Sequence, residues 1–311
     1  MGSICCAAET SSPSVSRSGL QAIPSFAFDC TSLVWVLGSR LRKDILREVA
    51  SYWPVCTPLL LLQPAAFTWV VPPVCCSVAH QPLENKLLFS ASFTLASLGA
   101  GLGVLCVYEY GQPGNRVQLL NNGRFTPMPR TLVQRDQPGM VFDPSLRSLY
   151  LFGGINYDNG YPFAMVRKSE RFDFGSYKWT PVEDMTYARA SFTPTRYAGL
   201  IYLCGGHQSS IETYAPCTRL YHTLQITLPE ASSCLALFQR NVLVVLSDNY
   251  LTRWQGLKQV TEQRARHPVT YYQQPMLAGK CLYVQNLLTL DLWELEIEGA
   301  AMRRVDVINL C

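Results

Sequence analysis

Apolar residues gather in short paired runs along most of this chain. Five segments share one pattern, in which an apolar strand, a short turn and a stronger apolar strand follow one another: residues 93–108, 140–154, 192–206, 234–248 and 271–286. Runs of this length, rich in β-branched and aromatic residues, predict strands, and each segment therefore predicts a β-hairpin. The hairpins recur at intervals of roughly 40 to 50 residues, which is the size of one repeat in several β-repeat folds.

Further strands are expected between these hairpins. The strand-like runs are residues 117–120, 169–174, 219–226, 250–255 and 290–297. Each unit then supplies three or four short strands. Because such a small twisted sheet cannot bury both of its faces alone, the copies are expected to stack radially as the blades of a β-propeller.

Two double glycines and a tryptophan fit this arrangement. The pairs Gly153-Gly154 and Gly205-Gly206 both end apolar runs, where the chain must turn sharply beside a neighbouring blade. Glycine has no Cβ, so it accepts positive φ and a close approach of other backbone. Trp179 is expected to fill the space between adjacent sheets.

The middle of the chain resembles kelch repeats. The features that carry the resemblance are Gly153-Gly154, the pair Phe172-Asp173, Trp179 seven residues after the phenylalanine, and Trp293 in a run similar to the third strand of such a blade. The resemblance covers roughly residues 87–311 and is strongest in the middle. It implies an all-β fold, a kelch-type β-propeller of about five to six blades.

Two segments precede the repeats. Residues 1–38 are expected to form a flexible tail, residues 39–54 an amphipathic helix that Pro54 ends, and residues 55–311 the propeller. The helix is faintly similar to the first helix of an F-box, which implies an alternative function as a substrate receptor of a ubiquitin ligase. The simpler alternative is a helix that packs on the propeller.

The chain begins with the sequence MGSICC, which resembles an N-myristoylation signal at Gly2, although Cys6 stands where serine or threonine is preferred. Palmitoylation of Cys5 and Cys6 would supply the second lipid that stable membrane attachment needs. The alternative is an ordinary tail with two incidental thiols. We expect a cytoplasmic protein, peripheral on the cytoplasmic face of a membrane if these residues are acylated.

Composition narrows the classes of function. The net charge of +4 is scattered, so nothing favours nucleic acid as a partner. The twelve cysteines include no CxxC pair, and most lie in apolar stretches, which predicts reduced, buried thiols and no metal site. Residues 49–83 and 87–108 carry almost no charge, but the first stretch is rich in proline and the second repeats the pattern of residues 190–206, so both are expected in the β-domain.

We expect no catalytic residue and no cofactor. Some kelch-like propellers are copper-radical oxidases, which makes a propeller oxidase a third alternative, but the propeller segment offers few imidazoles: His207, His222 and His267 are the three beyond residue 87. A protein-binding scaffold or adaptor explains the same features with fewer demands. Residues 155–169 and 207–218 are expected to be long loops that bind another protein, with five candidate contacts: Tyr157, Tyr161, Phe163, Arg167 and Tyr214.

Overall fold

The computed structural model describes most of the chain from residue 59 onward. The described ranges are 59–63, 66–71, 76–82, 93–99, 102–109, 111–121, 124–157, 164–239, 241–247, 250–264, 276–278, 281–285, 292–296, 302–305 and 308–309. These ranges contain strands, turns and loops and no helix. The predicted tail and the predicted helix at residues 39–53 lie outside them.

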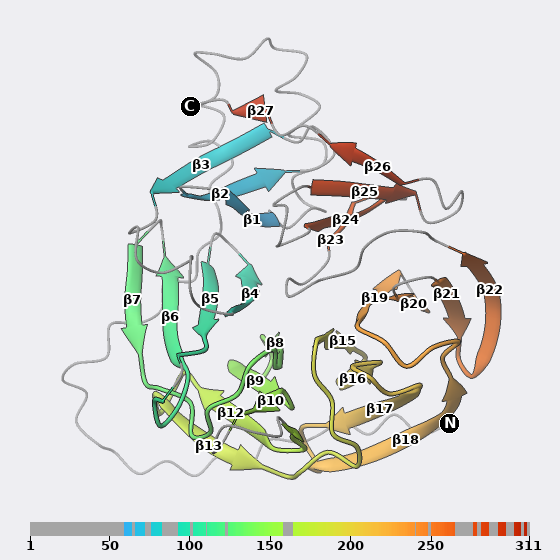
Figure 1. Cartoon of the computed structure of the whole chain (residues 1–311), viewed down its shortest axis with the longest axis horizontal. Coiled ribbons are helices and arrows are strands. Elements are labelled where there is room, and N and C mark those ends of the chain that lie inside the picture. Colours follow the sequence, from blue (N-terminus) through green and yellow to red (C-terminus); the bar gives the residue numbers. More distant parts are fainter. Residues whose placement is uncertain are drawn as a thin grey trace.

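The described strands form six sheets of four or five strands, arranged around a ring (Figure 1). The first sheet holds β1 (Leu59–Gln63), β2 (Ala66–Val71), β3 (Cys76–Pro82) and β27 (Ile308–Asn309). The second holds β4 (Phe93–Gly99), β5 (Leu102–Val107), β6 (Arg116–Asn121) and β7 (Arg124–Met128). The third holds β8 (Gly139–Asp143), β9 (Ser148–Phe152), β12 (Ser169–Asp173) and β13 (Lys178–Val182).

The remaining sheets repeat the plan. The fourth holds β15 (Thr195–Tyr197), β16 (Leu200–Cys204), β17 (Ser210–Ala215) and β18 (Leu220–Thr227). The fifth holds β19 (Cys234–Gln239), β20 (Val242–Ser247), β21 (Tyr250–Gln255) and β22 (Lys258–Arg264), with β14 (Phe192–Thr193) added parallel to β19. The sixth holds β23 (Met276–Ala278), β24 (Cys281–Gln285), β25 (Leu292–Glu296) and β26 (Met302–Val305). A separate small hairpin pairs β10 (Ile155–Asn156) with β11 (Ala164–Met165).

The sheets from β4 to β22 follow one another as four consecutive blades of a propeller-like fold. In each of these blades the first strand lies nearest the centre of the ring and the last lies at the rim (Figure 1). Consecutive strands of a blade pair antiparallel, so each blade is a small meander. All five predicted hairpins are confirmed, because each forms two neighbouring antiparallel strands.

Both faces of the inner strand β9 are buried between the two neighbouring blades. Every residue of β9 is buried, and alternate side chains enter different clusters. Leu149 and Leu151 pack with the β4–β7 blade, whereas Tyr150 and Phe152 pack with the β15–β18 blade. This two-sided burial explains why β9 gives a strong apolar run in the sequence.

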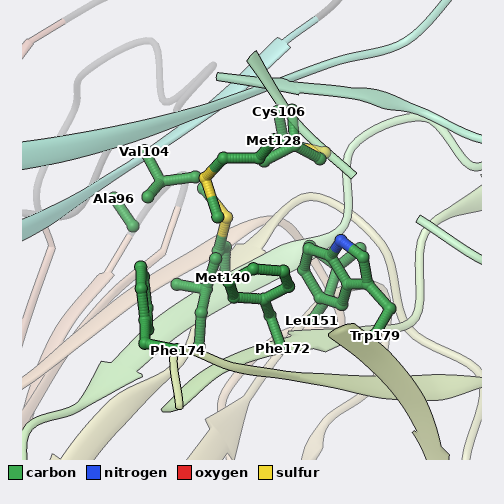
Figure 2. Close-up of a cluster of buried hydrophobic side chains, with 11 residues drawn as sticks. Ala96, Val104, Cys106, Met128, Met140, Leu151, Phe172, Phe174 and Trp179 are labelled. Atoms are coloured by element: carbon green, nitrogen blue, oxygen red, sulfur yellow. The ribbon is translucent and has the colours of Figure 1, made fainter. Parts of the chain in front are cut away.

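Trp179 is the anchor that the sequence predicts. Its indole lies 7% exposed, with its ring centroid 5.2 Å from that of Phe172, in a cluster with Met128 and Met140 between two blades (Figure 2). The indole Nε1 donates a 2.9 Å hydrogen bond to the carbonyl of Pro129, which follows the outer strand of the preceding blade. Trp179 lies in the fourth strand, β13, and joins two blades by packing and by this hydrogen bond.

One predicted loop is wrong. Residues 207–218 contain β17, the third strand of its blade, and the run at 219–226 is the fourth strand, β18. The prediction failed because β17 holds Ser210, Glu212 and Thr213, whose polarity hides a strand that is buried along most of its length.

Candidate functional site

The double glycines lie where backbones of neighbouring segments meet. Gly153, Gly154, Gly205 and Gly206 have φ values of 58°, 106°, 66° and 69°. A Cβ on Gly153 would lie 2.1 Å from the carbonyl oxygen of Arg189, and one on Gly205 would lie 2.2 Å from the Sγ of Cys234. Only glycine fits such a position, since it combines positive φ with contact distances that no real Cβ makes.

A buried arginine holds each double-glycine turn. Arg135 and Glu170 are fully buried and form an ion pair in the β8–β13 blade. Nη1 of Arg135 also donates to the carbonyls of Gly153 at 3.1 Å and Lys168 at 2.6 Å. Burial lowers the pKa of Arg135, and the charge of Glu170 counteracts that effect. The guanidinium therefore ties the double-glycine turn to the third strand of its blade.

The next blade repeats this arrangement. Arg189 and Glu212 are also fully buried, and Nη2 of Arg189 lies 3.0 Å from Oε1 of Glu212. Nη1 of Arg189 donates to the carbonyls of Gly205 at 2.5 Å and Ser210 at 2.9 Å. We call each such group of a buried arginine, a buried glutamate and a double-glycine turn an arginine clamp.

The glutamate of each clamp also fixes the loop that enters its blade. Glu170 accepts hydrogen bonds from the backbone N–H groups of Leu132 and Val133, at 2.7 and 3.0 Å. Glu212 does the same with Thr186 and Tyr187, at 2.9 and 3.1 Å. Carboxylates with this many partners are satisfied structural groups. At one end of its blade, each clamp thus holds both the double-glycine turn that follows the second strand and the loop that enters the blade.

The meander order divides these connections between two faces. In an antiparallel four-stranded blade, the connection between strands two and three and the connection to the next blade lie at the same end. We call this end the loop face, and it includes residues 108–109, 111–115, 129–138, 153–157, 164–168, 183–194 and 205–209. We call the opposite end the turn face, and it includes residues 144–147, 174–177, 198–199, 216–219 and 256–257.

Tyr157, a predicted contact, lies on the loop face in a polar and aromatic group. Its ring centroid is 5.5 Å from that of Tyr108, and its hydroxyl donates a 3.2 Å hydrogen bond to Oδ2 of Asp136. Gln137 follows Asp136 and accepts a hydrogen bond from the Ser191 hydroxyl, so the group connects two blades. Gln137 and Ser191 both have left-handed backbone conformations, with φ of 52° and 55°.

The other predicted contacts lie in different environments. Arg167 is exposed on the loop face, and its Nε donates a 2.6 Å hydrogen bond to the carbonyl of Met185. Tyr214 is 1% exposed and packs against Tyr150 and Phe152, so it belongs to the core rather than to a surface. Tyr161 and Phe163 lie outside the described residues, as do Gly2, Cys5 and Cys6, and the acylation of the last three stays a prediction.

Two predicted repeat residues also have clear positions. Asp173 ends β12, and its carboxylate accepts hydrogen bonds from the backbone and hydroxyl of Ser176, which lower its pKa. It therefore shapes the turn before Trp179. Trp293 lies in β25, opposite Val284 of β24 and Arg304 of β26, so it occupies the third strand of its sheet as predicted.

Three exposed apolar side chains on the loop face were missed by the sequence reading. Leu132 is 49% exposed, Met165 is 36% exposed and Tyr187 is 40% exposed. Leu132 lies in the connection from β7 to β8 and Tyr187 in the connection that follows β13, whereas Met165 lies in the connection from β9 to β12 that also carries Tyr157 and Arg167. No periodic pattern could have found them, because Leu132 and Tyr187 lie in connections whose backbone the clamp glutamates bond, and Met165 lies in the two-residue strand β11.

The described residues contain no group of three or more His, Cys, Asp or Glu side chains that would hold a metal ion. Among the described cysteines, Cys106, Cys204 and Cys217 are free thiols; Cys106, Cys204 and Cys234 are buried, and Cys217 is exposed. Burial raises the pKa of the Cys106 and Cys204 thiols to about 12, so both stay protonated at neutral pH. Within the same part of the chain, no helix is long and apolar enough to cross a membrane.

The chain is similar in structure to solved proteins. No protein-family model matches the sequence, and no curated protein matches it. Among solved structures, the structure of YjhT aligns with 66% of this chain and 72% of its own length, at 12% sequence identity and a TM-score of 0.48.

Proposed function

We propose that this protein is a non-catalytic scaffold or adaptor, built as a kelch-type propeller of six blades, that binds another protein through its loop face. The six sheets around the ring support the blade number. The double-glycine turns, the Phe172-Asp173 pair and the interblade position of Trp179 support the kelch type.

One observation carries the proposed binding role. The loop face displays Leu132, Met165 and Tyr187 at 36% to 49% exposure, and it also carries the exposed Arg167 and the partly buried Tyr157. Tyrosine, methionine and arginine are enriched at the centres of protein interfaces, where each buries a large contact area. The clamps hold the backbone of this surface rigid, which limits the entropy lost on binding.

The test compares the two faces with matched variants in the full chain expressed in eukaryotic cells. We expect Tyr187→Ala combined with Arg167→Ala to lower the recovery of a specific co-purified protein at least tenfold, because interface tyrosine and arginine each contribute roughly 1–2 kcal/mol or more to binding. The matched control combines Tyr177→Ala with Lys178→Ala on the turn face. It removes the same kinds of side chain at nearly equal exposure, since Tyr177 is 42% exposed and Tyr187 is 40% exposed.

Quantitative mass spectrometry of the purified complexes gives the readout. A partner that binds the control and wild-type proteins equally, and the loop-face variant poorly, is the expected result. Recovery that is unaffected by the loop-face variant would remove that face from the proposed function.

A further inference from the structure

The turn face carries exposed cations from several blades. Arg147 precedes β9, Lys178 begins β13, Arg219 precedes β18 and Lys258 begins β22, and all four side chains are exposed. They belong to three consecutive blades. Within the described part of the chain, none of the four forms an ion pair.

The carboxylates near these cations are already engaged. Asp143 is 2% exposed, lies 3.1 Å from Nε of Arg196, and accepts a 2.6 Å hydrogen bond from the Ser145 hydroxyl. Asp173 pairs with Arg171 at 2.8 Å and shapes its own turn. The described turn face therefore has an excess of positive charge.

The loop face differs in this respect. Two of its exposed cations have acidic partners, since Arg130 lies 2.7 Å from Glu109 and Lys168 lies 3.0 Å from Asp184. The third, Arg167, donates a hydrogen bond to the carbonyl of Met185. The buried arginines of the clamps are paired as well. Among the described blades, the exposed cations without an ion pair are thus more numerous on the turn face, which favours attraction of an anionic surface to that face.

An exposed apolar side chain stands next to a cation in three successive turns between third and fourth strands. The pairs are Tyr177-Lys178, Arg219-Leu220 and Leu257-Lys258, in which the apolar members are 42%, 54% and 57% exposed. Such pairs suit the boundary between lipid headgroups and acyl chains, because the apolar group enters the boundary while the cation remains at the phosphates.

The backbone of these turns gives a separate indication. Arg147, Tyr177 and Arg219 have φ values of 47°, 56° and 60°. Glycine occupies the same left-handed region at Gly199 and Gly256 on this face, where side chains would meet no other atom. Arginine and tyrosine are strained in this conformation relative to glycine or asparagine, so turn stability alone does not account for them.

We propose that the turn face docks onto the surface of an anionic lipid bilayer. The unpaired cations attract the headgroups, and Tyr177, Leu220 and Leu257 enter the interface beside them. A bilayer fits better than a single acidic peptide because the contacts come from the turns of three separate blades. In this orientation the loop face points away from the membrane and stays accessible. The proposal needs no acyl chain and is independent of the proposed partner site.

The experiment uses the full chain with Gly2→Ala, so that no acyl chain contributes to binding. Its partition onto vesicles of phosphatidylserine and phosphatidylcholine is measured by sedimentation, beside vesicles of phosphatidylcholine alone. We expect binding that requires phosphatidylserine and weakens as salt is added. Arg147→Asn combined with Arg219→Asn is expected to lower the partition coefficient roughly 25-fold.

Asparagine tolerates positive φ, so the double variant is expected to unfold at the same temperature or higher, which separates lost binding from lost folding. The control removes two cations from the loop face, through Arg130→Asn and Lys168→Asn, and is expected to bind the vesicles like the parent protein. Absence of phosphatidylserine-dependent binding, or equal losses in both variants, would overturn the proposal. Binding to polyglutamate without binding to vesicles would also overturn it and assign the turn face to an acidic protein.

Discussion

Replacing Arg189 with alanine is expected to lower the free energy of unfolding by about 4 kcal/mol, because removing one partner of a buried ion pair leaves the other charge uncompensated. Glu212 would lose its ion-pair partner in a site with no exposure to solvent. The carbonyls of Gly205 and Ser210 would lose hydrogen bonds as well. The midpoint of urea unfolding, followed by tryptophan fluorescence, measures the effect.

Two comparisons make this prediction specific. Lys168→Ala breaks the ion pair between Lys168 and Asp184, whose side chains are 60% and 37% exposed. This substitution is expected to change the free energy of unfolding by less than ~0.5 kcal/mol. Combining Arg189→Met with Glu212→Leu removes both buried charges and is expected to be less harmful than Arg189→Ala alone. If Arg189→Ala costs no more than Lys168→Ala, the arginine clamp does not hold its blade together.

Replacing Gly205 with alanine is expected to lower the free energy of unfolding by about 3 kcal/mol, from a left-handed backbone and a steric clash together. The residue has φ of 66°, and the added Cβ would lie 2.2 Å from Sγ and 2.6 Å from Cβ of Cys234 in the next blade. The β15–β18 and β19–β22 blades would have to separate to admit it. Thermal unfolding of the purified variant measures the loss.

Gly199 provides the matched control. Its φ is 80°, but a Cβ there would meet no atom within 4 Å. Gly199→Ala therefore isolates the conformational cost, which is expected to be about 1 kcal/mol. Equal effects of the two substitutions would mean that close packing against Cys234 contributes nothing to the requirement for glycine at residue 205.

The repeat could be found in the sequence because its strongest signals are local. The second strands β5, β9 and β20 are buried along almost their whole length, and this produces a continuous apolar run. The double glycines mark positive φ directly, and Trp179 marks the packing between blades. Each of these features depends on a few neighbouring residues, so one sequence was enough to recognise it.

The arginine clamps were missed because their members are far apart and their spacing varies. Arg135 and Glu170 are 35 residues apart, whereas Arg189 and Glu212 are 23 apart. The difference arises because the connection between the second and third strands is longer in the β8–β13 blade than in the β15–β18 blade. A buried glutamate also made β17 resemble a loop. Tyr214 was predicted as a surface contact for a similar reason. Tyr150 and Phe152, which bury its ring, are distant in the sequence and meet it only in the fold.

Site-specific photo-crosslinking tests most directly the central claim that the loop face binds a protein partner. A photoreactive phenylalanine analogue replaces Tyr187 on the loop face or Tyr177 on the turn face, at nearly equal exposure, in the full chain in eukaryotic cells. We predict a discrete crosslinked protein from position 187 that is absent from position 177 and is lost on adding Arg167→Ala. The same protein crosslinked from both positions, or from position 177 alone, would contradict it.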